Sequence, residues 1–160
     1  MSSKLDTVSN IDVIAVPEGS PMSASFEEKS VWIQLAAMVI VLACYVYVSA
    51  GMIAQGVRVF TPFFAVFMTA AAAMVVILVA GHIVAAITGP TEAADERDRL
   101  IGWRSESNAS WILGAGAFMA ITGMGLGFES VWTANLLVVS MFLSEIVKHV
   151  LQLVYYRRGL

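Results

Sequence analysis

The stretch from Phe60 to Thr88, FTPFFAVFMTAAAAMVVILVAGHIVAAIT, contains no Asp, Glu, Lys or Arg. A helix needs about 20 consecutive apolar residues to cross the hydrocarbon of a bilayer, so this run is long enough to cross with tilt. Pro62 suits the first turn of such a helix, where its missing N–H costs nothing. The run therefore predicts a transmembrane helix over 60–88.

Three further apolar runs extend this interpretation to the whole chain. They cover about 31–54, 110–128 and 131–156. The links at 55–59 and at GFES (127–130) are short, and short links require antiparallel neighbours. We predict an all-α polytopic membrane protein, an antiparallel bundle of four transmembrane helices built as two hairpins.

The composition of the 160 residues supports this class and excludes others. Hydrophobic residues make up 59% of the chain and charged residues 13%, whereas a soluble domain is about one quarter charged. The net charge of −3 argues against nucleic acid as a partner. The single cysteine, Cys44, cannot form an internal disulfide. We find no nucleophile–base pair, phosphate-binding glycine loop or metal triad, and we expect no enzymatic activity.

The basic residues are distributed unevenly over the two ends of the predicted helices. Arg58 alone flanks one end. Seven basic residues flank the other: Lys4, Lys29, Arg97, Arg99, Arg104, Arg157 and Arg158. Because Lys and Arg are enriched on the cytoplasmic side, we predict a multi-pass protein of the bacterial inner membrane with both termini in the cytoplasm. Residues 1–25 lack a signal-peptide pattern, and we expect a flexible tail before a transmembrane domain over 26–160.

A charged segment lies between the second and third predicted helices. Its charges alternate in sign around Leu100, Ile101 and Trp103, which predicts an amphipathic helix over 94–107 at the cytoplasmic membrane surface. This helix has either a solvated face laced with salt bridges or a docking surface for a partner. Its charged residues are Asp95, Glu96, Arg97, Asp98, Arg99 and Arg104. Arg157 and Arg158 give the C-terminus a basic end at the same membrane face.

The last predicted helix carries polar groups within an apolar run. Glu145, Lys148 and His149 of SEIVKHVLQ (144–152) lie within about one helical turn, and Asn135 lies earlier on the same helix. A charge at the centre of a membrane helix costs roughly 2.5–3.5 kcal/mol, so Glu145 is expected to face the bundle, neutralised by protonation or by Lys148. One interpretation is a structural cluster that fastens the helix to its neighbours. The other is a functional proton, ion or ligand site.

Small residues recur along one side of the third predicted helix. Gly116, Ala120, Gly123 and Gly127 follow one another at spacings of four, three and four, which places them on one face. Close backbone approach between membrane helices uses such faces. The stripe predicts helix packing within the bundle, with a dimerisation face as the alternative.

The chain has two histidines, His82 and His149, in helices that both run toward the predicted cytoplasmic side. His82 precedes Pro90 by eight residues and His149 precedes Arg157 by eight, so their rings are expected at similar depths. Such a pair is one way to ligate a b-type haem. The other interpretation is two hydrogen-bonded interfacial histidines. We expect no cofactor, with haem b as the alternative.

Three stretches give the chain a resemblance to a family: FEEKSVWIQL (26–35), DERDRLIGWRS (95–105) and TANLLVVSMFLSEIVKHVLQLVYYRRG (133–159). Over residues 26–160 the chain resembles a widespread family of small, uncharacterised four-helix bacterial membrane proteins. The resemblance implies the same four-span layout and no particular biochemical activity. Some similar membrane proteins sit beside transcriptional regulators as signal partners, which is an analogy. The positions that match the family pattern are Asp95, Glu96, Arg97, Asp98, Arg104, Asn135, Glu145, Tyr156, Arg157 and Arg158.

Together these features predict a non-enzymatic inner-membrane protein that acts as an accessory subunit or a membrane signalling partner. Its partners are expected to be the lipid bilayer and another membrane or cytoplasmic protein, or a second copy of the chain. The alternative is a small proton-coupled carrier or ion-binding protein that uses Glu145 together with Asn135 and His149.

Overall fold

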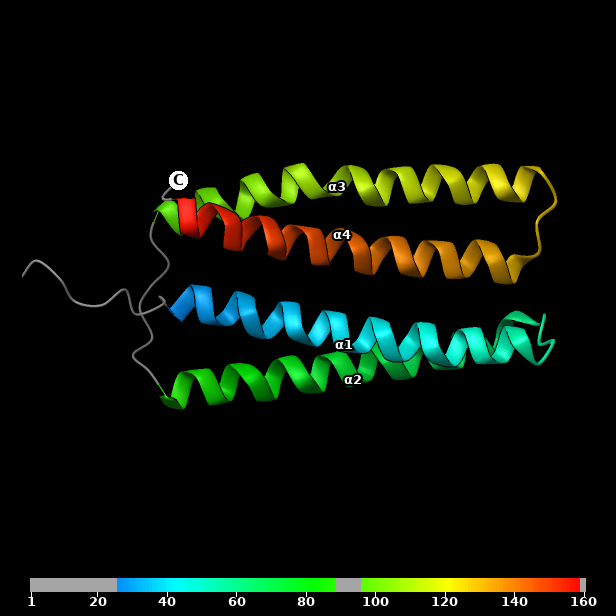
Figure 1. Ribbon diagram of the computed structural model, residues 1–160, viewed down its shortest axis with the longest axis horizontal. Coiled ribbons are helices and arrows are strands. Elements are labelled where there is room, and N and C mark those ends of the chain that lie inside the picture. The colour runs from blue at the N-terminus through cyan, green and yellow to red at the C-terminus, as the bar shows by residue number, and fades with distance from the viewer. Residues whose placement is uncertain (1–25, 89–95, 159–160) are drawn as a thin grey trace, which may run out of the picture.

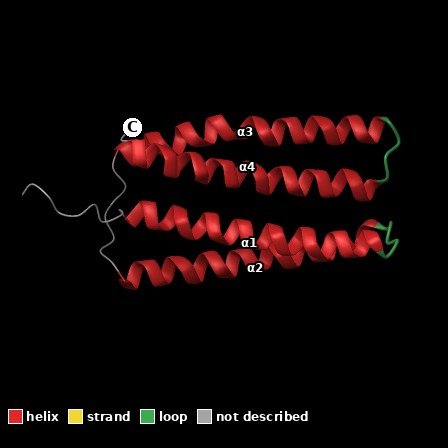
Figure 2. Cartoon of the chain, viewed as in Figure 1, coloured by secondary structure: helices red, strands yellow, loops and turns green. Residues whose placement is uncertain are grey.

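The computed structural model describes residues 26–88 and 96–158, and these form four long α-helices. Their bounds are Phe26–Ala54 (α1), Phe60–Thr88 (α2), Glu96–Gly125 (α3) and Ser130–Arg158 (α4). The described ranges contain no strand, as Figure 2 shows. The predicted fold class, an all-α helical bundle, is confirmed. The N-terminal tail predicted for residues 1–25 lies outside the described residues.

The helices form two antiparallel hairpins that lie side by side (Figure 1). α1 packs against both α2 and α4, while α3 packs chiefly along α4. In the view of Figure 1, α4 and α1 are therefore the inner helices and α3 and α2 the outer ones. Because α3 has one main neighbour, no other described helix covers its outer side.

Both hairpins turn through the same glycine-dependent structure. Gly56 and Gly127 have φ values of 84° and 79°, which glycine adopts without strain. In the second turn the Phe128 N–H donates to the Gly123 carbonyl at 2.9 Å, the long bond of a Schellman cap, and the first turn has the equivalent bond. α3 consequently ends at Gly125, before the end at residue 128 that the sequence predicts.

α3 differs further from its prediction. The expected amphipathic segment and the expected third span form one continuous helix from Glu96, and residues 94–95 lie outside the described ranges. Within these ranges, α1, α2 and α4 are long and apolar enough to cross a membrane. α3 does not qualify, because its first half is polar as far as Ser110. The fourth crossing remains a prediction.

The core lies where α1 and α4 meet, and much of the outer surface is apolar. Met38, Val41 and Phe142 are buried against one another. Tyr47 on α1 and Ile87 on α2 are 82% and 80% exposed. Extensive exposed apolar surface on long helices is typical of contact with lipid.

Candidate functional site

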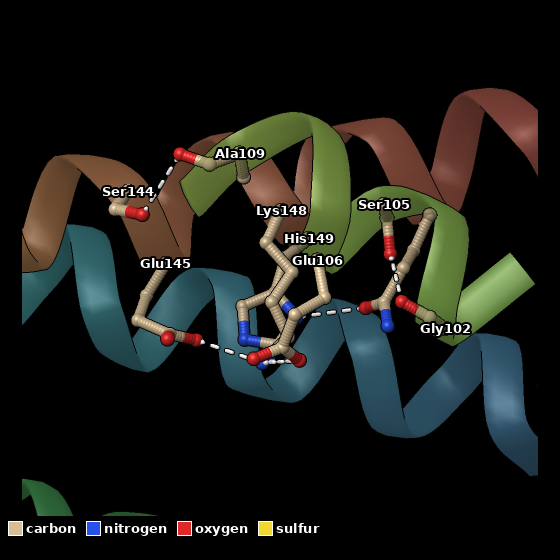
Figure 3. Close-up of polar contacts among 9 residues, drawn as sticks. Gly102, Ser105, Glu106, Ala109, Ser144, Glu145, Lys148 and His149 are labelled. Atoms are coloured by element: carbon tan, nitrogen blue, oxygen red, sulfur yellow. Dashed lines mark hydrogen bonds and ion pairs between the residues drawn. The ribbon is translucent and has the colours of Figure 1, made fainter. Parts of the chain in front are cut away.

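Lys148 lies between two carboxylates from different helices (Figure 3). Its ammonium nitrogen is 3.1 Å from an oxygen of Glu145, one turn earlier on α4, and 3.1 Å from an oxygen of Glu106 on α3. The side chains of Lys148, Glu145 and Glu106 are 21%, 37% and 63% exposed. These three residues, termed the charge triad, join the two helices of the second hairpin.

Glu106 is the member of the charge triad that the sequence pattern missed. The contact of Glu106 with Lys148 could have been predicted from the geometry of the hairpin. Residues equally distant from a short antiparallel turn lie side by side, and Glu106 precedes the turn by about as many residues as Lys148 follows it. Helical spacing within α4 relates Lys148 only to Glu145 and His149, which lie on the same helix.

Two further polar contacts, one buried and one partly buried, lie beside the charge triad. The Ser144 hydroxyl donates to the Ala109 carbonyl at 3.0 Å, which ties α4 to α3 (Figure 3). His149 is 3% exposed, and its Nδ1 lies 2.9 Å from the Gln152 side-chain oxygen, to which it donates. His149 is thus packed next to the triad, with an amide as its hydrogen-bond partner.

Asn135 lies apart from the charge triad, although the sequence grouped them. It precedes Glu145 by ten residues, which is about 15 Å along a helix. The Tyr45 hydroxyl of α1 donates to the Asn135 side-chain oxygen at 2.9 Å, and the Asn135 amide donates to the Val131 carbonyl at 2.8 Å. The predicted polar cluster is therefore two sites, one joining α4 to α3 and one joining α4 to α1.

The charged motif at the start of α3 meets the end of α4. The Tyr156 hydroxyl donates to an Asp98 carboxylate oxygen at 2.9 Å, and Arg97 donates to the Tyr156 carbonyl at 3.5 Å. Asn108 donates to the Tyr155 hydroxyl at 2.9 Å. Two of the predicted motif residues thus anchor the C-terminal turn. The remaining described members are exposed on the bundle surface: Glu96, Arg99, Arg104, Arg157 and Arg158. Asp95 lies outside the described residues.

The small-residue stripe faces the interior of the chain. Gly116 is buried in direct contact with Ser140 of α4, so that a side chain at position 116 would overlap it. Ala120 and Gly123 are buried on the same helix. Gly127 instead lies beyond the end of α3 and caps it. Three stripe residues therefore serve packing inside the second hairpin, and the fourth forms the turn.

The histidine on α2 is fully engaged in hydrogen bonds. His82 Nδ1 donates to the Leu78 carbonyl at 2.7 Å, and its Nε2 accepts from Ser30 at 3.0 Å. Gln34 in turn donates to the Ser30 oxygen at 3.0 Å. A haem iron at His82 would have to displace the Ser30 bond. This arrangement is that of a hydrogen-bonded histidine that joins α2 to α1.

The charge triad is the strongest candidate for a functional site in the described ranges. It holds two carboxylates against one ammonium, so it can take up one proton or cation, or it can simply clamp two helices. Within these ranges, no group of three or more His, Cys, Asp or Glu residues is placed to hold a metal ion.

Comparisons with protein-family models, with curated proteins and with solved structures found no match. The family resemblance therefore stays a prediction. Function has to be inferred from the residues of this chain.

Proposed function

We propose that the protein is a non-enzymatic protein of the bacterial inner membrane that serves as an accessory subunit or signalling partner of another protein. Three helices long and apolar enough to cross a bilayer support residence in a membrane. The excess of Lys and Arg at one end of the helices supports an orientation with both termini in the cytoplasm. The polar half of α3 and the last turn of α4 lie at that end (Figure 1).

The observation that carries this proposal is the outer face of the polar half of α3. Leu100 and Trp103 are 52% and 72% exposed in this otherwise charged segment. Arg99 and Arg104 are exposed next to them in the sequence. Trp and Arg are enriched among the residues that dominate protein–protein binding energies. Among residues 26–88 and 96–158, no helix packs over this face, because α3 packs chiefly along α4.

The charge triad supports a structural role for Glu145. Its carboxylate shares Lys148 with Glu106, which lies in the polar half of α3 and is mostly exposed. A carrier must release its ion or proton on both sides of the membrane, whereas these carboxylates are held by a lysine that joins two helices. The geometry therefore favours an interaction protein over a transporter.

Site-specific photo-cross-linking tests the proposal directly. A photoreactive phenylalanine replaces Trp103, and in a matched variant it replaces Phe118, which is also 72% exposed but lies in the apolar half of the same helix. We expect one discrete protein adduct from position 103 in native membranes. Position 118 is expected to give mainly lipid adducts.

A second substitution, beside position 103, is the control for the cross-linking experiment. Arg104→Glu reverses one exposed charge beside Trp103 and is expected to abolish the adduct without altering the amount of protein in the membrane. Equal cross-linking at positions 103 and 118, or an adduct that survives Arg104→Glu, would contradict the proposal.

The second candidate is a proton-coupled carrier, favoured by the unequal charges of the triad. Two carboxylates share one ammonium, which leaves one negative charge for a proton to neutralise. Glu145→Gln removes that charge and keeps the shape of the side chain. The carrier predicts loss of pH-dependent uptake into proteoliposomes with stability intact, whereas a structural clamp predicts a change in stability alone.

A further inference from the structure

A groove of about 640 Å³ opens between α3 and α4 next to their turn. It runs from Glu129 in the turn along the first part of α4 to Leu136, which is roughly 10 Å at the rise of an α-helix. Apart from Glu129 at one end, its walls are mainly apolar. They include Met119, Ala120, Gly123, Phe128, Trp132 and Leu136. Two of these wall residues, Ala120 and Gly123, add almost no side-chain volume.

A pair of opposite charges lies at the turn end of this groove. Arg58, from the turn of the first hairpin, has its Nε 3.9 Å from a Glu129 carboxylate oxygen. The Arg58 guanidinium also lies 5.7 Å from the centre of the Trp132 ring. Both charged side chains are about half exposed, at 47% and 55%.

The separation of these two charges leaves their hydrogen-bonding groups available to a ligand. A distance of 3.9 Å is an ion pair but is too long for a hydrogen bond, so the guanidinium N–H donors and the carboxylate oxygens keep their bonding capacity. The groove end therefore presents a cation and an anion side by side, above an apolar channel. This pattern is complementary to a zwitterion attached to a hydrocarbon chain.

We propose that the groove binds a phospholipid whose zwitterionic headgroup ends in a primary ammonium, as in phosphatidylethanolamine. One acyl chain lies between α3 and α4, the phosphate accepts hydrogen bonds from Arg58, and the ammonium donates to Glu129. The groove is on the outer surface of a span candidate, α4, where the bilayer supplies the ligand. This inference does not depend on the proposed protein partner.

The headgroup preference follows from the two charges. Phosphatidylglycerol has a phosphate for Arg58 but no cation for Glu129, and its negative charge is repelled by that carboxylate. Phosphatidylcholine has a cation without N–H donors, which can lie against Trp132 but cannot donate to Glu129. One partly exposed ion pair contributes enough to separate these lipids by up to about fivefold.

Native mass spectrometry of the full chain in mild detergent measures this preference. Phosphatidylethanolamine, phosphatidylglycerol and phosphatidylcholine with identical acyl chains are added in equal amounts. We expect the wild-type chain to retain phosphatidylethanolamine about fivefold more than either of the others. Arg58→Gln and Glu129→Gln are each expected to abolish the preference, and because both side chains are half exposed, neither change is expected to unfold the protein.

Filling the groove separates specific binding from general lipid contact. Met119→Trp adds bulk at the groove wall and is expected to lower retention of all three lipids. Met141→Trp places the same side chain on the surface of α4 outside this groove and is expected to leave retention unchanged. Equal retention of the three lipids by the wild type overturns the proposal. So does a preference that survives both charge substitutions, or identical behaviour of the two tryptophan variants.

Discussion

The ammonium nitrogen of Lys148 on α4 lies 3.1 Å from a carboxylate oxygen of Glu106 on α3. Glu106 lies in the polar half of α3, only five residues before Trp111, an exposed side chain at the start of the apolar half. The ion pair therefore joins the helices near the level at which α3 passes from its polar half to its apolar half. A pair in this position fixes how far α3 is displaced along α4.

Lys148→Met is expected to lower the free energy of unfolding by about 1 kcal/mol. The substitution leaves the Glu145 carboxylate, 37% exposed, and the mostly exposed Glu106 carboxylate without their shared cation, and water screens most of the effect at Glu106. Equilibrium unfolding in mixed detergent–SDS micelles measures the change. Lys148→Arg is expected to keep most of the stability, and adding Glu145→Gln to Lys148→Met is expected to restore part of it. Wild-type stability of Lys148→Met would show that the charge triad does not hold the hairpin.

Gly116→Ala is expected to destabilise the second hairpin by about 1–3 kcal/mol, because the new methyl group would overlap the Ser140 side chain. Gly114→Ala is the matched control, since nothing lies within 4 Å of its added carbon. That change is expected to stabilise the helix by up to about 1 kcal/mol. The same unfolding assay distinguishes the two. Ser140→Gly in the Gly116→Ala background is expected to recover the loss, and failure to recover it would count against direct contact.

Tyr45→Phe is expected to cost about 0.6 kcal/mol, and at most about 1.7 kcal/mol, the range of interhelical hydrogen bonds in membranes. The substitution removes the donor to Asn135 and keeps the buried ring. Tyr47→Phe is the control, because Tyr47 is almost fully exposed. Thermal unfolding in detergent checks both variants. Equal effects of the two changes would mean that the bond between α1 and α4 contributes nothing.

The orientation is testable with single cysteines. Cys44→Ser removes the natural thiol, and Arg58→Cys and Arg157→Cys then place one thiol at each end of the helices. We expect a membrane-impermeant maleimide to label the first variant in intact cells and the second only after the inner membrane is opened. The reverse pattern would place the charge-rich end of the bundle outside the cytoplasm.

The sequence was sufficient to predict the bounds of α2, the position of the first turn and the all-α class, whereas the second turn begins earlier than predicted. A long apolar run specifies a helix by itself, and short links specify antiparallel neighbours. That α3 is one continuous helix was harder to predict. Its polar half is typical of a helix in water, and its apolar half is typical of a helix in lipid. The assignment of Gly127 to a stripe failed for a related reason. Helical spacing does not reveal where a glycine ends the helix.

The composition of the candidate site was only partly predictable. Glu145 and Lys148 are near in sequence, so their contact follows from helical spacing. Glu106 and Tyr45 come from other helices, and which helices pack together is not encoded in spacing within one helix. Asn135 lies apart from the charge triad for the same reason. Asn135 is turned toward α1, whereas the triad joins α4 to α3.

The half-polar character of α3 has a consequence for biogenesis. When α3 leaves the ribosome, its hydrophilic first half disfavours stable residence in the bilayer on its own. Its main neighbour, α4, is synthesised afterwards and is apolar enough to insert. The translocon is therefore expected to hold α3 until α4 emerges and to release the two into lipid as one hairpin.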